Sequence, residues 1–142
     1  MASTYQVKVH WYDERSVISS IPVTSATVVA VGDMVAVESN ALTLVDAAAN
    51  DSVFCGIAMG ISANGETAAI PVAIGDVIGD VTVASAAYRF GAGLTASTDG
   101  SFADDAGANT ICFVISDNTS ADTTATVRFN ATELKKYYAI SA

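Results

Sequence analysis

The sequence is short of basic side chains, with six Lys and Arg against fifteen Asp and Glu in 142 residues and a formal net charge of −9 at pH 7. A chain of this charge repels phosphates, which argues against nucleic acid as a partner. Long apolar runs are also missing, because Gly, Ser, Asn or Asp interrupts them before the roughly 18 residues that a membrane-spanning helix needs. We therefore expect no nucleic-acid and no membrane partner.

Histidine and cysteine are scarce, with one His and two Cys. A hydrolytic triad needs a His beside its nucleophile, whereas His10 stands in an alternating strand pattern. Cys55 and Cys112 stand in apolar runs, where Cys is usually a small core residue. The N-terminus lacks the basic flank and apolar segment of a secretory signal. We expect free thiols, synthesis in the cytoplasm, no cofactor and no enzymatic activity.

Two short stretches resemble ligand-binding loops. Residues 91–96 (GAGLTA) fit a dinucleotide-binding pattern, but hairpin residues (STDGSF) follow where that pattern needs a helix, so no dinucleotide site is predicted. The loop from Asp99 to Asn109 also contains Asp104 and Asp105, which are potential cation ligands. The spacing is not that of a calcium-binding EF-hand, and whether this loop binds a cation is left open.

The residues that are abundant favour β-structure. Hydrophobic residues make up 51% of the chain and charged residues 15%, where about 25% charged is usual, and much of the apolar share is Ala and Val. Short apolar or alternating runs separated by turn residues are typical of sandwiches and barrels. We predict an all-β fold, a small single-domain β-barrel or β-tulip of short antiparallel strands with extended N- and C-terminal segments. Strands are expected within residues 17–23, 26–32, 34–39, 41–46, 53–61, 67–74, 76–83, 88–96, 110–116 and 125–130.

The N-terminal segment predicts a further strand, because Tyr5, Val7, Val9 and Trp11 alternate with polar residues. This strand either pairs with the protein's own sheet or forms an arm that adds to the sheet of a partner. An arm could be deleted through Tyr12 without unfolding the barrel. We therefore divide the chain into an N-terminal strand or arm (1–15), a β-barrel domain (16–131) and a C-terminal tail (132–142).

The C-terminal tail has a different pattern, since Leu134, Tyr137 and Tyr138 recur at helical spacing after Thr132. Such a tail either packs back on the barrel or contacts another chain. The candidate docking residues for a partner are therefore Tyr5, Val7, Val9, Trp11, Tyr12, Leu134, Tyr137 and Tyr138.

One pattern occurs twice, in residues 31–60 and 90–117. Each copy has a Gly, an apolar run, a turn at Asn40 or Asp99, an "AAAN" or "AGAN" tetrapeptide, and an apolar run with a Cys. Gly32 and Gly91 are 91 − 32 = 59 positions apart. We expect the two copies to form corresponding parts of one barrel.

Several motifs occur in a fixed order, namely VGDMVAV (31–37), FCGIAMG (54–60), NGETAAIPVAIGDVIGDVTV (64–83), YRFGAGLTASTDGSF (88–102), TICFVISD (110–117) and TATVRFN (124–130). This order resembles that of small bacteriophage capsid decoration, or head cement, proteins. The residues that match the family pattern are Gly32 and Asp33, Gly56 to Ala58, Gly65 and Glu66, Gly91, Asp99 and Gly100, and Val127 to Phe129. The sequence departs from the pattern at Ala92, where Asp is usual, and at Cys112 to Val114.

The resemblance implies a β-barrel or β-tulip protein of the virion that binds the outer surface of the expanded icosahedral capsid and stabilises it without catalysis. It implies the major capsid protein as the partner and a homotrimer on the capsid. An alternative function is that of a receptor- or glycan-binding β-domain of a phage fibre or spike. Shell-binding assays distinguish these two functions, and deletion of residues through Tyr12 distinguishes an arm from a core strand.

Overall fold

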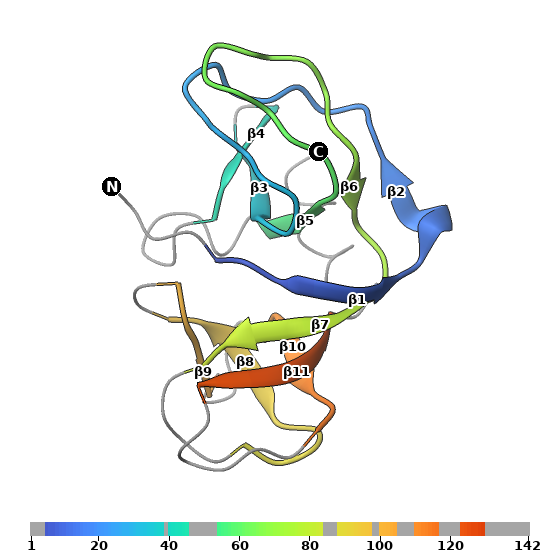
Figure 1. Ribbon diagram of the computed structural model, residues 1–142, viewed down its shortest axis with the longest axis vertical. Coiled ribbons are helices and arrows are strands. Elements are labelled where there is room, and N and C mark those ends of the chain that lie inside the picture. The colour runs from blue at the N-terminus through green and yellow to red at the C-terminus, as the bar shows by residue number, and fades with distance from the viewer. Residues whose placement is uncertain are drawn as a thin grey trace.

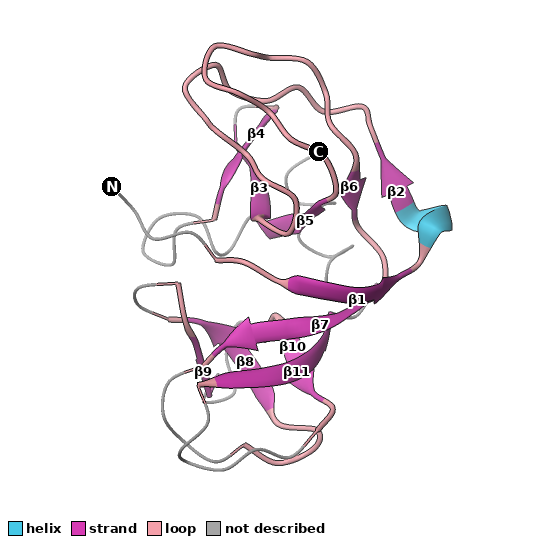
Figure 2. Ribbon diagram, viewed as in Figure 1, coloured by secondary structure: helices cyan, strands magenta, loops and turns pink. Residues whose placement is uncertain are grey.

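A computed structural model describes residues 5–38, 40–45, 54–83, 88–97, 100–104, 110–116 and 123–129. These residues form two antiparallel sheets and one short 3₁₀ helix, which confirms the all-β expectation (Figures 1 and 2). The upper sheet in Figure 1 has the order β2-β6-β5-β3-β4, and the lower sheet has the order β1-β7-β11-β10-β8-β9.

The upper sheet contains β2 (Val17–Ile18), β3 (Met34–Glu38), β4 (Ala41–Leu44), β5 (Phe54–Ala58) and β6 (Val72–Ala73). The lower sheet contains β1 (Lys8–Tyr12), β7 (Val77–Thr82), β8 (Gly93–Ala96), β9 (Phe102–Asp104), β10 (Cys112–Val114) and β11 (Thr124–Phe129). The 3₁₀ helix η1 (Glu14–Ser16) joins β1 to β2.

Most of these strands lie within the predicted runs, and two differences are informative. Residues 26–32 form no strand, only an isolated bridge between Val29 and Ser62 and a turn. Conversely, β9 was not predicted, because a strand of three residues next to "STDG" has the composition of a loop.

The chain folds into the same five-stranded unit twice. If β2 to β6 are matched in order to β7 to β11, the strand order β2-β6-β5-β3-β4 becomes β7-β11-β10-β8-β9, which is the observed order of the second unit. Every pairing is antiparallel in both units. The doubled sequence pattern therefore forms corresponding parts of two sheets, one in each unit, rather than parts of one barrel.

The turns match as well as the strands. Gly32 and Gly91 precede β3 and β8, with φ of 95° and 89°, a conformation that glycine adopts at little cost. The hairpins after β3 and β8 turn at Asn40, with φ of 64°, and at Gly100, with φ of 76°. Asp99, the predicted turn residue of the second hairpin, and the AAAN and AGAN tetrapeptides lie outside the described residues.

Each unit curls so that its edge strands approach one another. An isolated parallel bridge joins Val23, after β2, to Leu42 in β4, and an equivalent bridge joins Val83, after β7, to Phe102 in β9. These bridges are single contacts, so within the described ranges neither sheet closes through a continuous ladder.

The hydrophobic core has two clusters. One lies inside the curl of the first unit and contains residues such as Val35, Leu42 and Val72. The other fills the second unit and extends to the opposite face of the first unit through Met34, Ala36, Val45, Ile57 and Ala73. This shared cluster joins the two sheets.

The N-terminal strand pairs with the protein's own sheets. Lys8 to Tyr12 pair with β7, and just before them Tyr5 and Val7 flank the start of β3, where the Met34 N–H donates to the Tyr5 carbonyl (2.9 Å) and the Val7 N–H to the Gly32 carbonyl (2.8 Å). The segment therefore crosses from one unit to the other, and it runs between the two sheets in Figure 1.

Candidate functional site

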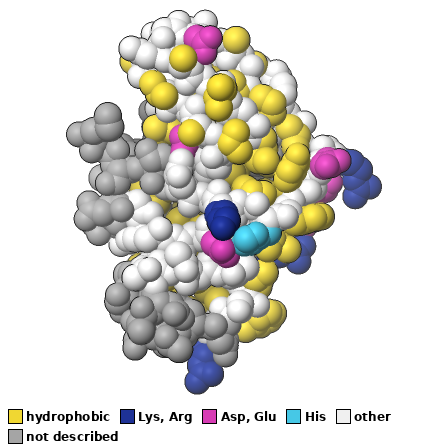
Figure 3. Space-filling view, in the orientation of Figure 1, with side chains coloured by type: hydrophobic (Ala, Val, Ile, Leu, Met, Phe, Trp, Pro, Cys, Tyr) yellow, Lys and Arg dark blue, Asp and Glu magenta, His cyan; other side chains and the backbone are white. Residues whose placement is uncertain are grey.

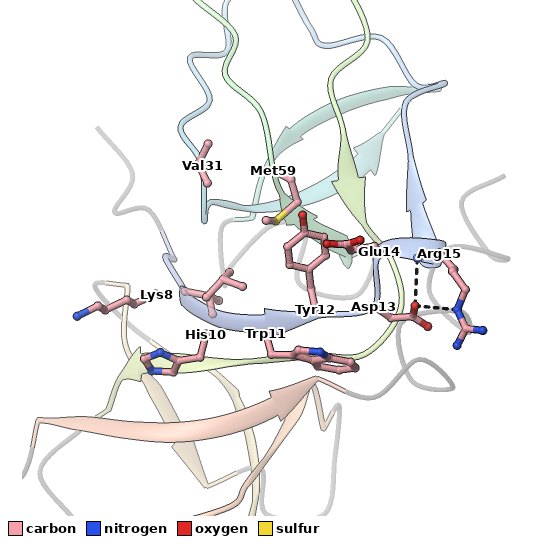
Figure 4. A pocket seen from close by; sticks show the side chains of 11 residues that line it. Lys8, His10, Trp11, Tyr12, Asp13, Glu14, Arg15, Val31 and Met59 are labelled. Atoms are coloured by element: carbon pink, nitrogen blue, oxygen red, sulfur yellow. Dashed lines mark hydrogen bonds and ion pairs between the residues drawn. The ribbon is translucent and has the colours of Figure 1, made fainter.

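A groove of about 800 Å³ lies along β1, between the two units. One side consists of β1 and the residues after it, from Val7 to Arg15, and the other of Val31 and Met59 from the first unit. Figure 4 shows Val31 and Met59 above β1, with the Tyr12 side chain directed up towards Met59. The groove therefore has apolar walls and charged residues at its rim.

A β-bulge shapes the β1 side of this groove. The pairing with β7 shifts between Val9 and Trp11 and leaves His10 as the extra residue. A bulge disturbs the alternation of side chains along a strand, and His10 and Trp11 accordingly point to the same side in Figure 4. Trp11, the only Trp in the chain, is thereby left 51% exposed.

A carboxylate on β7 binds the bulged residue. The His10 Nε2 atom lies 3.0 Å from Asp80 Oδ2, and the Thr126 hydroxyl donates to Asp80 Oδ1 (2.7 Å). The Thr126 hydrogen bond, with a smaller contribution from His10, lowers the pKa of Asp80 below its usual value. The group therefore remains a carboxylate in weakly acidic solution.

Asp13 stabilises the other end of the groove. Its carboxylate accepts the Arg15 N–H (3.0 Å) and caps η1, and the Arg15 guanidinium lies 3.4 Å away. The backbone hydrogen bond from Arg15 lowers the pKa of Asp13. These contacts fix the direction in which the chain leaves β1 towards β2.

The opposite wall of the groove depends on a buried carboxylate. Asp33, 3% exposed, accepts hydrogen bonds from Gln6 Nε2 (2.5 Å) and from the Ala30 N–H (2.8 Å). The first bond holds the N-terminal segment and the second closes the turn 30–33, which presents Val31. Asp33 thus positions both walls of the groove.

The predicted docking residues divide into three groups. Tyr5 and Val7 are buried, 2% and 4% exposed, so they belong to the protein's own core and are not at the surface. Val9 and Tyr12 are half-buried, and Trp11 is exposed. Leu134, Tyr137 and Tyr138 lie outside the described residues.

Sequence reasoning missed Val31, Met59 and Asp80. Val31 and Met59 lie inside the doubled pattern, at the residues that flank its glycines, and a comparison of its two copies could have found them. Asp80 could not be found in this way, because its partners His10 and Thr126 are distant in the sequence.

The two cysteines are the remaining candidates for nucleophilic chemistry. Cys112 is buried with a free thiol, and burial raises its pKa, which makes the thiolate nucleophile unavailable. Cys55 lies in β5, and its side chain is outside the described part. Within the described ranges there is no cluster of His, Cys, Asp and Glu that could hold a metal. No helix among those residues is long and apolar enough to cross a membrane.

Large apolar side chains are exposed around the groove and elsewhere. Figure 3 shows hydrophobic side chains over the upper sheet and down the right side of this face, with the single His at its centre. Those with the greatest exposure are Trp11, Val28, Val31, Ile61 and Phe90, between 51% and 74% exposed. Single exposed apolar side chains are common on protein surfaces, but Trp11 and Val31 both line the groove.

The fold and the groove define an all-β protein of two like units, with a groove between them that is lined by apolar and charged side chains. The sequence matches no model of a protein family, and no curated protein matches it.

Proposed function

We propose that this protein binds the outer surface of an expanded icosahedral bacteriophage capsid and stabilises it, without catalysing a reaction. Its partner in this proposal is the major capsid protein, on which it assembles as a homotrimer, and its location is the outside of the virion. The observation that carries the proposal is the ordered series of motifs that resembles capsid decoration proteins.

The placement of those motifs in the fold supports the proposal. Gly32 and Asp33 form the turn that opens β3, and Gly65 and Glu66 lie in a tight turn in which the Glu66 carboxylate accepts the Ala63 N–H (2.8 Å). The last motif, Val127 to Phe129, ends β11. The motifs thus lie in the strands and turns of both units and not in one local site.

The exposed apolar side chains also support it. A protein that coats a lattice binds through many small contacts, because identical subunits offer the same surface repeatedly and multivalency strengthens each contact. Of the docking residues predicted from sequence, Trp11 is the one exposed among the described residues. It is therefore the first to test in a capsid contact.

The experiment adds purified protein to expanded capsids that lack it. We expect saturable binding and a higher temperature at which the shells break open. The Trp11→Ser variant should bind more weakly, while a Ser20→Ala variant, changed at an exposed polar position, should bind as the wild type does. Absence of binding to expanded shells, or binding to host cells or glycans instead, would contradict the proposal.

A further inference from the structure

The groove along β1 lies beside an open edge of the lower sheet. β1 is the last strand in the order β1-β7-β11-β10-β8-β9, and its ladder is with β7. On the other edge, Tyr5 and Val7 bond to the start of β3, but from Lys8 to Tyr12 no strand of the described residues pairs with it. Such an edge offers backbone N–H and C=O groups to an added strand.

The first unit limits what can enter this groove. Val31 and Met59 stand across it from β1 (Figure 4), so an added strand has β1 on one side and the first unit on the other. The β1 of a second copy does not fit there, because its own β7 and first unit flank it. A terminal segment fits, because it brings no sheet with it.

The chain leaves β11 close to one end of the groove. Phe129 pairs with Val77, and Val77 pairs on its other side with Tyr12. Neighbouring strands are about 4.8 Å apart, so Phe129 lies about 10 Å from Tyr12. At least 142 − 129 = 13 residues follow Phe129, and at about 3.3 Å per residue they reach about 40 Å. This is enough to cross β7 and to follow the five residues of β1.

Charge also favours the C-terminal tail as the occupant. Residues 132–142 contain two Lys and one Glu, a formal charge of 2 − 1 = +1, whereas residues 1–131 contain four basic and fourteen acidic side chains, 4 − 14 = −10. Glu14, an exposed residue of the groove, makes no ion pair with another described residue. Lys135 and Lys136 are the cations that the tail can bring to this carboxylate.

We propose that the C-terminal tail binds in the groove of its own chain, as an extended segment antiparallel to β1. It enters at the Tyr12 end, where Lys135 and Lys136 meet Glu14, and runs towards Lys8. The contact is within one chain and does not depend on the proposed function. The tail side chains that pack against the apolar wall are those that follow the lysines, namely Tyr137, Tyr138 and Ile140.

The test uses Trp11 as the reporter, because it is the only Trp in the chain and lines the groove. Deletion of residues 132–142 should shift its emission to longer wavelength and increase its quenching by acrylamide. A synthetic peptide of residues 132–142, added to the shortened chain, should reverse both changes saturably. Micromolar peptide should leave the full chain unchanged, because the linked tail competes at an effective concentration of about 1 mM.

Two substitutions in the shortened chain locate the bound peptide. Val31→Ser should weaken peptide binding about tenfold, because it removes one apolar side chain from the contact. Glu14→Gln should weaken it about two- to fivefold, as expected for an exposed ion pair.

The matched controls change the same residue types outside the groove. Ile61→Ser removes an apolar side chain that is 74% exposed, and Glu66→Gln neutralises an exposed carboxylate in the turn 63–66. Neither residue lines the groove, so both variants should bind the peptide as the shortened wild-type chain does.

Circular dichroism melts show whether the shortened chain is folded. If it is not, the full chain with Tyr137→Ser and Tyr138→Ser provides the same comparison, because it keeps the length and charge of the tail. Its Trp11 emission should shift to longer wavelength, whereas Ser141→Ala should leave the emission unchanged.

The inference is wrong if loss of the tail leaves the Trp11 emission unchanged or if the peptide does not bind. It is also wrong if neither Val31→Ser nor Glu14→Gln weakens peptide binding, because the tail then binds elsewhere. A full chain that sediments as an oligomer, and as a monomer without its tail, would place the tail in the groove of a neighbouring copy and overturn the intramolecular arrangement. None of these measurements uses capsids, so a failure here leaves the proposed function standing.

Discussion

The two units have the same backbone plan but use one sheet face differently. Met34, Ala36, Ile57 and Ala73 of the first unit are at most 1% exposed and contribute to the shared core cluster. The corresponding residues of the second unit, by strand order and register, are Gly93, Thr95, Phe113 and Arg128, which are half-buried or exposed. The first unit thus has both faces of its sheet covered, whereas the second unit has one covered face. The size and polarity of the residues on the second face cause this difference.

The second contrast is the N-terminal strand, which has no repeat. It adds a sixth strand to the second unit and fills the space beside the start of β3 in the first. The two units are therefore joined by a segment that is not part of the repeat. The predictions that follow test this comparison.

Deletion of residues 1–12 should have the largest effect. It removes Tyr5 and Val7 from the shared cluster and exposes the β7 edge, and the loss of one buried aromatic alone costs about 3–5 kcal/mol, a large fraction of the stability of a small domain. We expect no cooperative transition in circular dichroism melts. The idea of a removable arm predicts a folded protein instead. A wild-type melting curve for the deletion would show that the segment is dispensable.

Replacement of matched core residues should come next. Leu42 and Phe102 occupy equivalent bridges to Val23 and Val83, and both are 0% exposed. Leu42→Ala should lower the free energy of unfolding by about 2–5 kcal/mol and Phe102→Ala by about 3–5 kcal/mol. Because Phe102 also makes edge-to-face contacts with Tyr5 and Phe129, we expect the decrease in unfolding free energy for Phe102→Ala at the upper end of its range.

Because the two units share a core cluster, both substitutions should lower one common transition in urea. Fluorescence of Trp11 and far-UV circular dichroism should give the same midpoint. Two separate transitions, with each variant shifting only its own, would mean that the units unfold independently.

Alanine at Gly32 and at Gly91 should distinguish the cost of the turn conformation from the cost of a clash with neighbouring residues. Both have a positive φ, so Ala costs about 1–2 kcal/mol at either site. A Cβ at Gly91 meets nothing within 4 Å, whereas a Cβ at Gly32 would lie 2.5 Å from the Val7 carbonyl oxygen. Gly32→Ala should therefore destabilise the protein more than Gly91→Ala in urea denaturation. Equal effects of the two substitutions would show that the N-terminal segment moves away from a Cβ at residue 32 without loss of stability.

The sequence predicted most strands and the doubled pattern, because alternation and turn residues are local properties. It did not reveal the full repeat, because loops of different length change the spacing between equivalent residues. The spacing is 91 − 32 = 59 between Gly32 and Gly91, 114 − 58 = 56 between Ala58 and Val114, and 127 − 72 = 55 between Val72 and Val127. The sequence also did not determine which strand pairs with β1, because an alternating strand fits any unpaired sheet edge with a matching apolar face. The groove depends on that pairing and on a turn from the other unit, so only the folded chain defines it.

The smallest expected effect concerns Asp80, which the first unit does not reproduce, since Ser19 and Pro71 stand at the places of Asp80 and Thr126 by register. The hydrogen bond from Thr126, followed by the contact with His10, lowers the pKa of the Asp80 carboxyl in the folded protein. A lowered pKa stabilises the fold above the unfolded value of about 3.9, and this contribution is lost as the pH falls through the folded pKa.

Thr126→Val should therefore reduce the loss of stability between pH 6 and pH 3. The side chain of Asp80 is 32% exposed, so solvent screening limits the difference to below about 1 kcal/mol. Urea titrations at the two pH values measure it, with Thr124→Val as the control, because Thr124 is exposed on the same strand. If Thr126→Val leaves the pH dependence at its wild-type size, the hydrogen bond is not what lowers the pKa, and the contact with His10 in the bulge of β1 becomes the cause to test by His10→Gln.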